Sequence, residues 1–248
     1  RYIAQSGGVW GTPVTVDGEA GIDAGRFADL EFLPSGVPAI AYMAMERDAD
    51  GRIITYARYV EANDADGSSW GTPVDLDVLD PTPCQAQTCG DEMVCVLSTG
   101  ICAAETSGCP DGCADDEGCI EDVCAAIDPG PNDLLEGTGI WPDLEVGPGQ
   151  TLGVIFYHRT DGNLIGVSYD GAVWTEPQLL AGRDTDIGWA PSLAIDADGV
   201  WHMSVVNGIT EDLIYFTSTG TVELVDGRSL GEHHAIRGDD SSITILSD

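Results

Sequence analysis

The sequence predicts an all-β protein of the β-propeller class, with four blades of four antiparallel strands. Two observations lead to this fold class. Short segments rich in β-branched and aromatic residues alternate with turns of Gly, Asp, Asn or Pro, as β-strands do. Four kinds of segment, here A to D, also recur in one order with a period of about 45–60 residues. A β-sandwich would explain the alternation but not the four-part repeat.

Segments A and B are recognised by their glycines and apolar runs. Each A segment opens with Gly and has Leu or Ile at its sixth position, and an apolar B segment follows it. The A segments are "GRFADLEF" (25–32), "GIWPDLEV" (139–146), "GWAPSLAI" (188–195) and "GEHHAIRG" (231–238). The B segments are 37–45, 151–158, 200–207 and "SITILS" (242–247). These segments supply the two innermost strands of each predicted blade.

Segments C and D complete each blade. The C segments are 1–9, 52–60, 163–171 and 212–220, and the D segments are "WGTPVTVD" (10–17), "WGTPVDLD" (70–77), 174–181 and 222–229. The two nearly identical D copies predict outer strands in which Trp10 and Trp70 pack and Pro73 is tolerated at a sheet edge.

The two ends of the chain predict how the ring closes. The chain starts with segments C and D and stops after segments A and B, which together make one blade. Pairing of the N- and C-terminal strands would close four blades and remove the exposed sheet edge. The alternative is that the chain is a fragment of a larger propeller. The predicted propeller comprises residues 1–79 and 138–248, with an insertion at 80–137.

Charge is the most unusual feature of the composition. The chain has 43 acidic residues and nine basic ones, all of them arginine, for a net charge of −34. Such a field disfavours nucleic acid and anionic membrane surfaces as partners. It predicts a solvated acidic surface suited to a salty or extracellular medium, with a multi-site cation binder as the alternative. The chain has no apolar run of the length that spans a membrane, about 18 residues.

Eight cysteines lie within the insertion, and their number and density predict an oxidising compartment, secreted or at the cell surface. They are Cys84, Cys89, Cys95, Cys102, Cys109, Cys113, Cys119 and Cys124. The two halves, "TCGDEMVCVLSTGIC" and "GCADDEGCIEDVC", resemble a tandem pair of the small four-cysteine modules of bacterial secreted proteins. The resemblance implies disulfides within each half. A zinc site is not predicted, because the insertion has no C-x2-C pair and no histidine.

The turn "SYDGAVW" (168–174) is similar to the Asp-box of sialidase-like propellers, through Ser168, Asp170, Gly171 and Trp174, although its Asp-to-Gly spacing is one residue short. "NDADGSSW" (63–70) is loosely similar. The resemblance implies a fold device, in which the Asp accepts backbone hydrogen bonds and the Trp packs between blades. It does not imply sialidase chemistry, because no arginines share a blade position and the "RIP" motif is absent.

The loops before strand A and after strand B predict a binding face around the central channel. The candidate ligand-binding residues are Arg26, Phe27, Trp141, Trp189, His233 and His234. Aromatic rings beside polar groups suit a glycan or an extracellular protein, so the chain is predicted to be a binding or structural module, with one role as a subunit of a surface assembly. Alternatively, Trp141 and Trp189 only plug the central channel or pack between blades. His233 and His234 are adjacent, so they do not readily bind one metal ion together.

Acidic residues give two further alternatives. Asp29 and Asp143 share one column of segment A and, with Glu232, could act as acid and base of a glycoside hydrolase; the simpler role is hydrogen bonding to neighbouring backbone. The D-A-D-G stretches, with Asp48, Asp50, Asp196 and Asp198, are first interpreted as turns and second as calcium sites. No motif requires a cofactor.

Overall fold

The structure is a computed structural model that describes residues 1–47, 53–79, 93–96, 101–104, 117–120, 123–126, 137–182, 186–226 and 241–246. The chain forms two compact units. The first comprises Arg1–Glu46, Thr55–Leu79 and Gly137–Asp248, and the second comprises Arg47–Ile54 and Asp80–Glu136. Each unit is described by itself.

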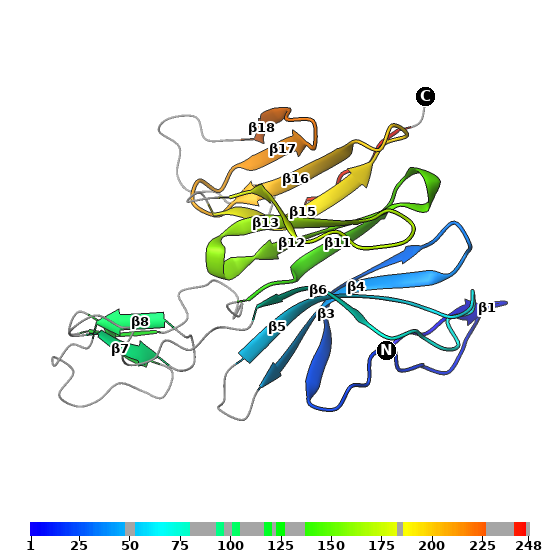
Figure 1. Cartoon of the computed structure of the whole chain (residues 1–248), viewed down its shortest axis with the longest axis horizontal. Helices are drawn as coiled ribbons and strands as arrows, with labels where there is room; N and C mark the ends of the chain where they lie inside the picture. Colours follow the sequence, from blue (N-terminus) through cyan, green and yellow to red (C-terminus); the bar gives the residue numbers. More distant parts are fainter. Residues whose placement is uncertain are drawn as a thin grey trace. The chain divides into compact units, whose positions relative to one another are not determined.

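Three four-stranded antiparallel sheets build the first unit, and each follows chain order from its first strand to its fourth (Figure 1). The first blade contains β3 (Ile22–Phe32), β4 (Pro38–Arg47), β5 (Ile53–Glu61) and β6 (Val74–Leu79). The second contains β11 (Ile140–Val146), β12 (Leu152–His158), β13 (Asn163–Tyr169) and β14 (Gln178–Ala181). The third contains β15 (Ile187–Ile195), β16 (Trp201–Asn207), β17 (Leu213–Thr217) and β18 (Val222–Asp226). The predicted all-β fold with repeating four-stranded sheets is confirmed, and the arrangement is consistent with a β-propeller.

The described residues contain only two short 3₁₀ turns, Pro148–Gln150 and Arg159–Asp161, and no α-helix. Accordingly, none of the described segments is a helix of the length and apolarity that would cross a membrane.

Apolar side chains fill the interfaces between successive blades. Every residue of β12 is buried, because alternate side chains of a strand point to opposite faces and this strand has a blade on each side. Val154 and Phe156 join the cluster shared with the first blade, whereas Ile155 joins the cluster shared with the third. This explains why the segment "LGVIFYH" is a continuous apolar run rather than an alternating one.

The first residues of the chain form a C–D pair, as predicted. Gly11 N donates to Ala4 O at 2.8 Å, and Tyr2 bridges Val14. The same bond joins strands C and D of the first two blades, from Gly71 N to Glu61 O at 2.9 Å and from Thr175 N to Ser168 O at 2.8 Å. Within this pair, β1 (Gln5–Ser6) pairs with β2 (Val9–Trp10).

The two tryptophans of the repeated "WGTPV" differ in environment. Trp70 packs edge-on against Tyr2, with 5.2 Å between the ring centroids, whereas Trp10 is 63% exposed. The prediction that both pack is therefore correct for Trp70 and wrong for Trp10.

Residues 241–246 take the position of strand A, which corrects the prediction that they form strand B. Ile243 N donates to Ser192 Oγ at 3.2 Å. The A strands of the second and third blades make the same contact to the A strand of the preceding blade. There, Leu144 N donates to Asp29 and Leu193 N donates to Asp143. With this register "GDDSSITI" (238–245) matches the A pattern, with Gly first and Ile243 sixth. The segment 231–238 shares that pattern, which explains the wrong alignment; it lies outside the described residues.

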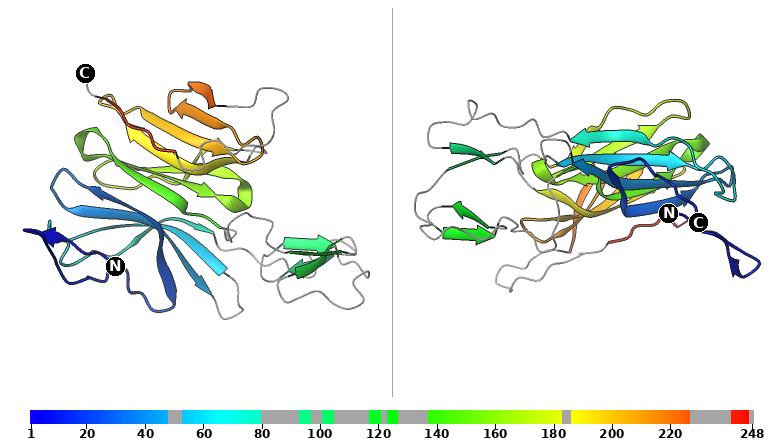
Figure 2. Two further views of the ribbon diagram at one scale, coloured as in Figure 1. Left: turned by 180° about the vertical axis from the view of Figure 1, so that it is seen from behind. Right: turned by 90° about the horizontal axis from the view of Figure 1, so that it is seen from below.

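The predicted closure by pairing of the two ends is not found in the described part of the chain. Residues 1–14 pair among themselves, and residues 241–246 contact β15 instead. The N-terminal segment lies on the side of the first blade and residues 241–246, in red, on the side of the third (Figure 2).

The described residues of the second unit form two short hairpins. One pairs β7 (Met93–Val96) with β8 (Ile101–Ala104), and the other pairs β9 (Glu117–Ile120) with β10 (Val123–Ala126). Their registers place Cys95 opposite Cys102 and Cys119 opposite Cys124. Cys84, Cys89, Cys109 and Cys113 lie outside the described residues, so disulfides within each half stay a prediction.

Candidate functional site

In each of the three complete blades, the start of the A strand carries the same backbone distortion. A glycine with positive φ is followed two residues later by a non-glycine residue with positive φ, and the pairing with strand B shifts register there. The pairs are Gly25 (98°) with Phe27 (51°), Gly139 (80°) with Trp141 (49°), and Gly188 (138°) with Ala190 (42°). Each non-glycine residue in this conformation costs about 1–3 kcal/mol and persists only where the surrounding structure holds it. The repeated bulge is therefore a built feature of this face.

Four aromatic rings meet beside these bulges. This aromatic cluster consists of Phe27, Trp141, Tyr157 and Trp189. Trp141 is central: its ring centroid lies 5.9 Å from Phe27, 5.9 Å from the nearly parallel ring of Tyr157, and 6.3 Å from Trp189. Tyr157 is buried, Trp141 and Trp189 are partly buried, and Phe27 is 39% exposed. The cluster therefore has a buried base and a partly exposed surface.

A carboxylate is held at the edge of the aromatic cluster. Tyr157 Oη donates to Asp186 Oδ1 at 2.5 Å, and Trp189 Nε1 reaches the same oxygen at 3.2 Å and Tyr157 Oη at 3.1 Å. Burial, together with the hydrogen bond to Asp186, raises the pKa of Tyr157, so its hydroxyl remains a donor. These bonds fix the rings of Tyr157 and Trp189.

The predicted binding residues are only partly brought together. Phe27, Trp141 and Trp189 lie in one cluster, whereas the exposed Arg26 forms an ion pair with Asp23 at 2.9 Å. His233, His234 and Glu232 lie outside the described residues. Tyr157 and Asp186 were missed by the sequence reasoning. Tyr157 ends an apolar B segment and so resembles a core residue, and no pattern distinguishes Asp186 from other loop acids.

Asp29 and Asp143 join neighbouring blades. Asp29 Oδ2 accepts a hydrogen bond from Leu144 N at 2.8 Å, and Asp143 Oδ2 accepts one from Leu193 N at 3.1 Å. Ser192 makes the corresponding contact to Ile243 N. One position of strand A thus binds the backbone of the next A strand in three successive places. This is the simpler of the two roles predicted for the carboxylates.

Four carboxylates interact across the interface of β3 and β11: Asp29, Glu31, Asp143 and Glu145. Burial, with the nearby charge of Asp29, raises the pKa of Asp143 to about 6. Burial, with the charges of Glu31, Asp143 and Asp29, raises the pKa of Glu145 to about 7. Burial also raises the pKa values of Asp29 and Glu31. These carboxyls therefore bind protons more readily than exposed ones do.

The D-A-D-G stretch of the third blade forms a turn in which the first carboxylate binds the loop itself. Asp196 Oδ1 accepts hydrogen bonds from Asp198 N at 2.9 Å and Val200 N at 2.8 Å, and Oδ2 contacts His202 Nε2 at 3.2 Å. Among the described residues, no group of three or more His, Cys, Asp or Glu side chains could hold a metal ion. Asp48 and Asp50 lie outside the described residues.

In comparisons with known proteins, no family model matches the chain and no curated protein matches it. The turns that resemble the Asp-box use their aspartates locally: Asp64 accepts from Asp66 N and Ser68 N, and Asp170 accepts from Ala172 N and Val173 N. Function must therefore be inferred from the geometry of the site.

Proposed function

We propose that this protein is a secreted or cell-surface binding module that recognises a glycan through the aromatic cluster. The observation that carries the proposal is the convergence of Phe27, Trp141 and Trp189, from the A strands of three blades, on one partly exposed surface. Aromatic rings stack on the apolar faces of sugars, and a fixed acceptor such as Asp186 orients hydroxyl groups. An extracellular protein is the alternative partner.

Charge narrows the class of ligand. The net charge of −34 repels anionic glycans and phosphate-bearing polymers at a distance. The carboxylates of β3 and β11 add negative charge on neighbouring parts of the same A strands. A neutral or basic partner is therefore favoured. The dense cysteines of the insertion support an extracellular location.

Replacing Trp141 or Trp189 with alanine is expected to weaken glycan binding at least tenfold, because truncation removes a ring that stacks on the sugar; interface hot spots of this kind contribute about 2 kcal/mol or more. A glycan array would first identify a ligand, and titration calorimetry would then measure the affinity of each variant. Phe27→Ala removes a more exposed ring and provides a variant with less effect on packing.

Trp10→Ala is the matched control, because Trp10 is 63% exposed and belongs to the outer strand pair of residues 1–17. It should bind like the unaltered protein. Near-UV circular dichroism checks that each variant keeps its tertiary structure. If Phe27→Ala, Trp141→Ala and Trp189→Ala all bind the array ligand normally, the aromatic cluster is not the binding surface.

A carbohydrate-active enzyme is the second candidate, favoured by the raised pKa values of Asp143 and Glu145 on innermost strands. Asp143→Asn preserves an acceptor for Leu193 N and so keeps the contact between blades. An enzyme that uses Asp143 should lose turnover on a panel of glycosidase substrates while it remains folded and binds glycan. If the protein is a binding module, the unaltered protein should show no turnover. If the unaltered protein turns over a substrate and Asp143→Asn does not, the protein is an enzyme that uses Asp143.

We further infer that the end segments belong to one fourth blade. Residues 1–17 have the C–D pairing of the complete blades, and residues 241–246 have the strand A position next to the third blade. A fourth blade between the third and the first would contain both segments. On this basis a four-bladed ring is retained as a proposal, with these two segments supplying strands A, C and D of the fourth blade.

A further inference from the structure

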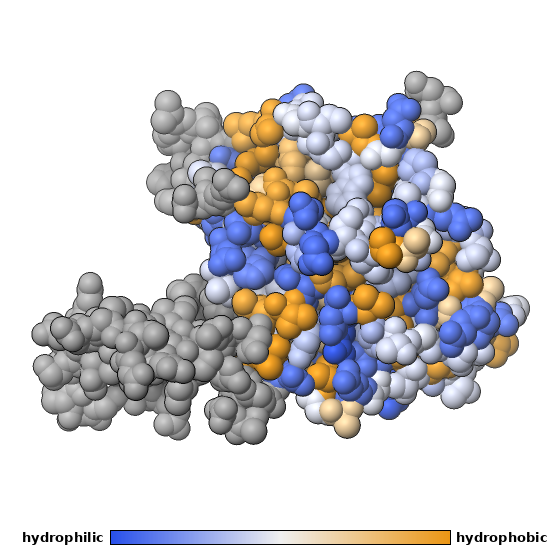
Figure 3. All heavy atoms as spheres, in the orientation of Figure 1, coloured by the Kyte–Doolittle hydropathy of each residue, from blue (hydrophilic) through white to orange (hydrophobic). Residues whose placement is uncertain are grey.

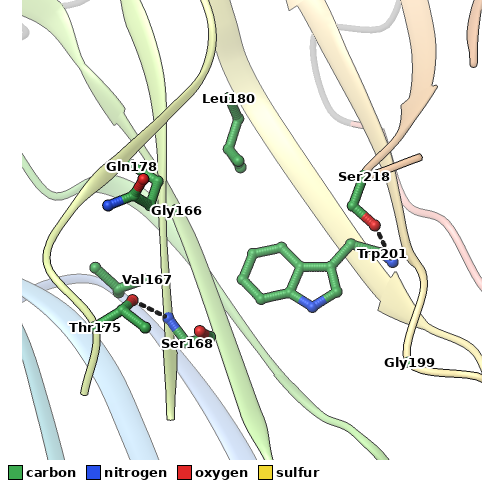
Figure 4. Close-up of a pocket in the computed structure, with 9 residues that line it drawn as sticks. All are labelled: Gly166, Val167, Ser168, Thr175, Gln178, Leu180, Gly199, Trp201 and Ser218. Carbon is green, nitrogen blue, oxygen red and sulfur yellow. Dashed lines mark hydrogen bonds between the residues drawn. The ribbon is translucent and has the colours of Figure 1, made fainter. Parts of the chain in front are cut away.

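A groove lies between the second and third blades, on a part of the unit that the proposed function does not use (Figure 4). This Trp201 groove has a volume of about 280 Å³. Trp201 and Ser218 line it from the third blade, and Gly166, Ser168, Gln178 and Leu180 line it from the second. A second hollow of about 360 Å³ shares Trp201, Ser168 and Gly199 with it.

The groove exists because two large side chains are missing at this interface. Between the first and second blades, the rings of Tyr59 and Trp174 pack together, with centroids 4.9 Å apart. In the first blade, Tyr59 of strand C pairs with Val74 of strand D. The corresponding pair in the second blade is Gly166 with Gln178, so a glycine stands where the first blade has Tyr59. The C–D turn of the third blade, residues 217–222, has no tryptophan. The space filled at one interface is therefore open at the next.

Two glycines make room for the indole of Trp201. A Cβ atom at Gly153 would lie 2.8 Å from one indole carbon, and a Cβ atom at Gly166 would lie 3.1 Å from another. Glycine within a strand weakens it and commonly marks a place where another group approaches closely. Leu152, the buried residue that starts strand B in the second blade, occupies the position corresponding to Trp201. The third blade thus has a larger, flat and only partly buried ring there.

The other lining groups are polar and uncharged. Gln178 Nε2 donates to the carbonyl oxygens of Glu176 and Pro177, at 3.0 and 3.2 Å, which orients the amide. Its carbonyl oxygen accepts no hydrogen bond from the described part of the chain. Ser168, Thr175 and Ser218 contribute hydroxyl groups to the lining. Donors and acceptors therefore lie around an apolar ring.

We propose that the Trp201 groove binds a neutral sugar unit of an oligosaccharide, whose apolar face stacks on the indole while its hydroxyls contact Gln178 and the serines. None of the nine residues that line the groove is charged, and an anionic ligand would also meet the field of the −34 chain. A cation would find no carboxylate in the groove itself. The second hollow offers room for a neighbouring sugar beside Asp170 and Asp198.

The test uses the full chain and four neutral hexasaccharides: cellohexaose, xylohexaose, mannohexaose and laminarihexaose. Calorimetric titration should find binding of at least one of them. Trp201→Leu, which introduces the residue of the corresponding position in the second blade, should weaken that binding at least tenfold. Gln178→Tyr, at an exposed position on the rim, should also weaken it by filling the groove. Val74→Tyr, at the corresponding exposed position of the first blade, is the matched control and should have no effect.

The outcome is separable from that of the proposed function. Trp141→Ala should leave binding in the groove unchanged, because the aromatic cluster does not line it. Thermal unfolding shows whether Trp201→Leu remains folded. If it does not, the affinity of Gln178→Tyr for the hexasaccharide tests whether the groove is the binding site. The proposal is overturned if no hexasaccharide binds at millimolar concentration, or if Gln178→Tyr binds as well as Val74→Tyr. If a Trp-Leu-Phe peptide binds the groove and none of the four hexasaccharides does, the groove is an apolar peptide site and the proposal is overturned as well.

Discussion

Replacing Arg58 with methionine is expected to lower the free energy of unfolding by about 3–5 kcal/mol, because it leaves the buried carboxylate of Asp17 without its cationic partner. Arg58 is only 5% exposed. Its Nε donates to Asp75 Oδ1 at 2.6 Å, and its Nη1 lies 3.1 Å from both Asp17 Oδ2 and Glu19 Oε2. The guanidinium also lies 4.7 Å from the ring centre of Tyr56. This one side chain therefore joins the N-terminal segment to the first blade.

Asp17 determines how this loss depends on pH. Its side chain is 5% exposed. Burial alone would raise its pKa, but hydrogen bonds from Glu19 N, Tyr42 and Arg58 hold the pKa below its ordinary value. Because the pKa of Asp17 is lower in the folded state than in the unfolded chain, its ionisation stabilises the fold at pH values above the ordinary pKa of about 4. This stabilisation is lost as the pH falls through the pKa of the folded state. The effect of Arg58→Met should therefore be largest near neutral pH and smaller in acid.

Urea unfolding followed by tryptophan fluorescence measures this effect. Arg26→Met is the control, since Arg26 and Asp23 form an exposed ion pair that contributes at most about 1 kcal/mol. Asp17→Asn combined with Arg58→Met should recover part of the loss, because the unpaired buried charge is removed. A loss for Arg58→Met no larger than that for Arg26→Met would show that the buried network does not stabilise the fold.

Glu145→Gln is expected to stabilise the protein by roughly 1–2 kcal/mol at pH 8 and to change its stability little at pH 4. The pKa of Glu145 is raised from 4.5 to about 7, so the folded state binds protons more tightly than the unfolded chain does. Stability therefore falls as the pH rises from about 4.5 to 7, and the whole penalty is present above that range. Glutamine has no charge to desolvate or repel; the magnitude allows for solvent screening at this partly buried site.

The measurement is the free energy of unfolding at a series of pH values between 4 and 8. Glu223→Gln, on the exposed strand β18, removes one negative charge away from the carboxylates of β3 and β11 and controls for the general repulsion of the acidic chain. Its curve should run nearly parallel to that of the unaltered protein. If the curve of Glu145→Gln is also parallel, charge repulsion at the β3–β11 interface does not set the pH dependence.

Local patterns predicted the strands well because they depend on near neighbours. The alternation of apolar residues, the glycine and aspartate turns and the bond from Gly11 to Ala4 involve residues close together in the chain. The same local character limited the prediction. Segments 231–238 and 238–245 both begin with Gly and have Ile at the sixth position, and only the contact between Ile243 and Ser192, 51 residues apart, identifies the second as strand A.

The exposed surface shows the same limit. An apolar residue in a strand pattern is expected to be buried, yet Val222, Leu224 and Val225 of β18 are 58–70% exposed. Apolar residues also lie at the surface over the third blade in Figure 3. Leu30 is 43% exposed, whereas Leu144 and Leu193, at the same position of the next two A strands, are buried against the preceding blade. Burial at this position depends on the neighbouring blade, not on the residue.

The sequence by itself determined the all-β class, the four-strand repeat, the acidic composition and the C–D pair at the start of the chain. Tertiary structure alone decided which side chains meet. Arg58 reaches Asp17 across 41 residues, Asp29 binds the backbone of Leu144 across 115, and the Trp201 groove opens where Gly166 replaces the ring of Tyr59. Strand formation depends on the hydrogen bonds and apolar alternation of adjacent residues. Sites depend on contacts between blades, which no local pattern records.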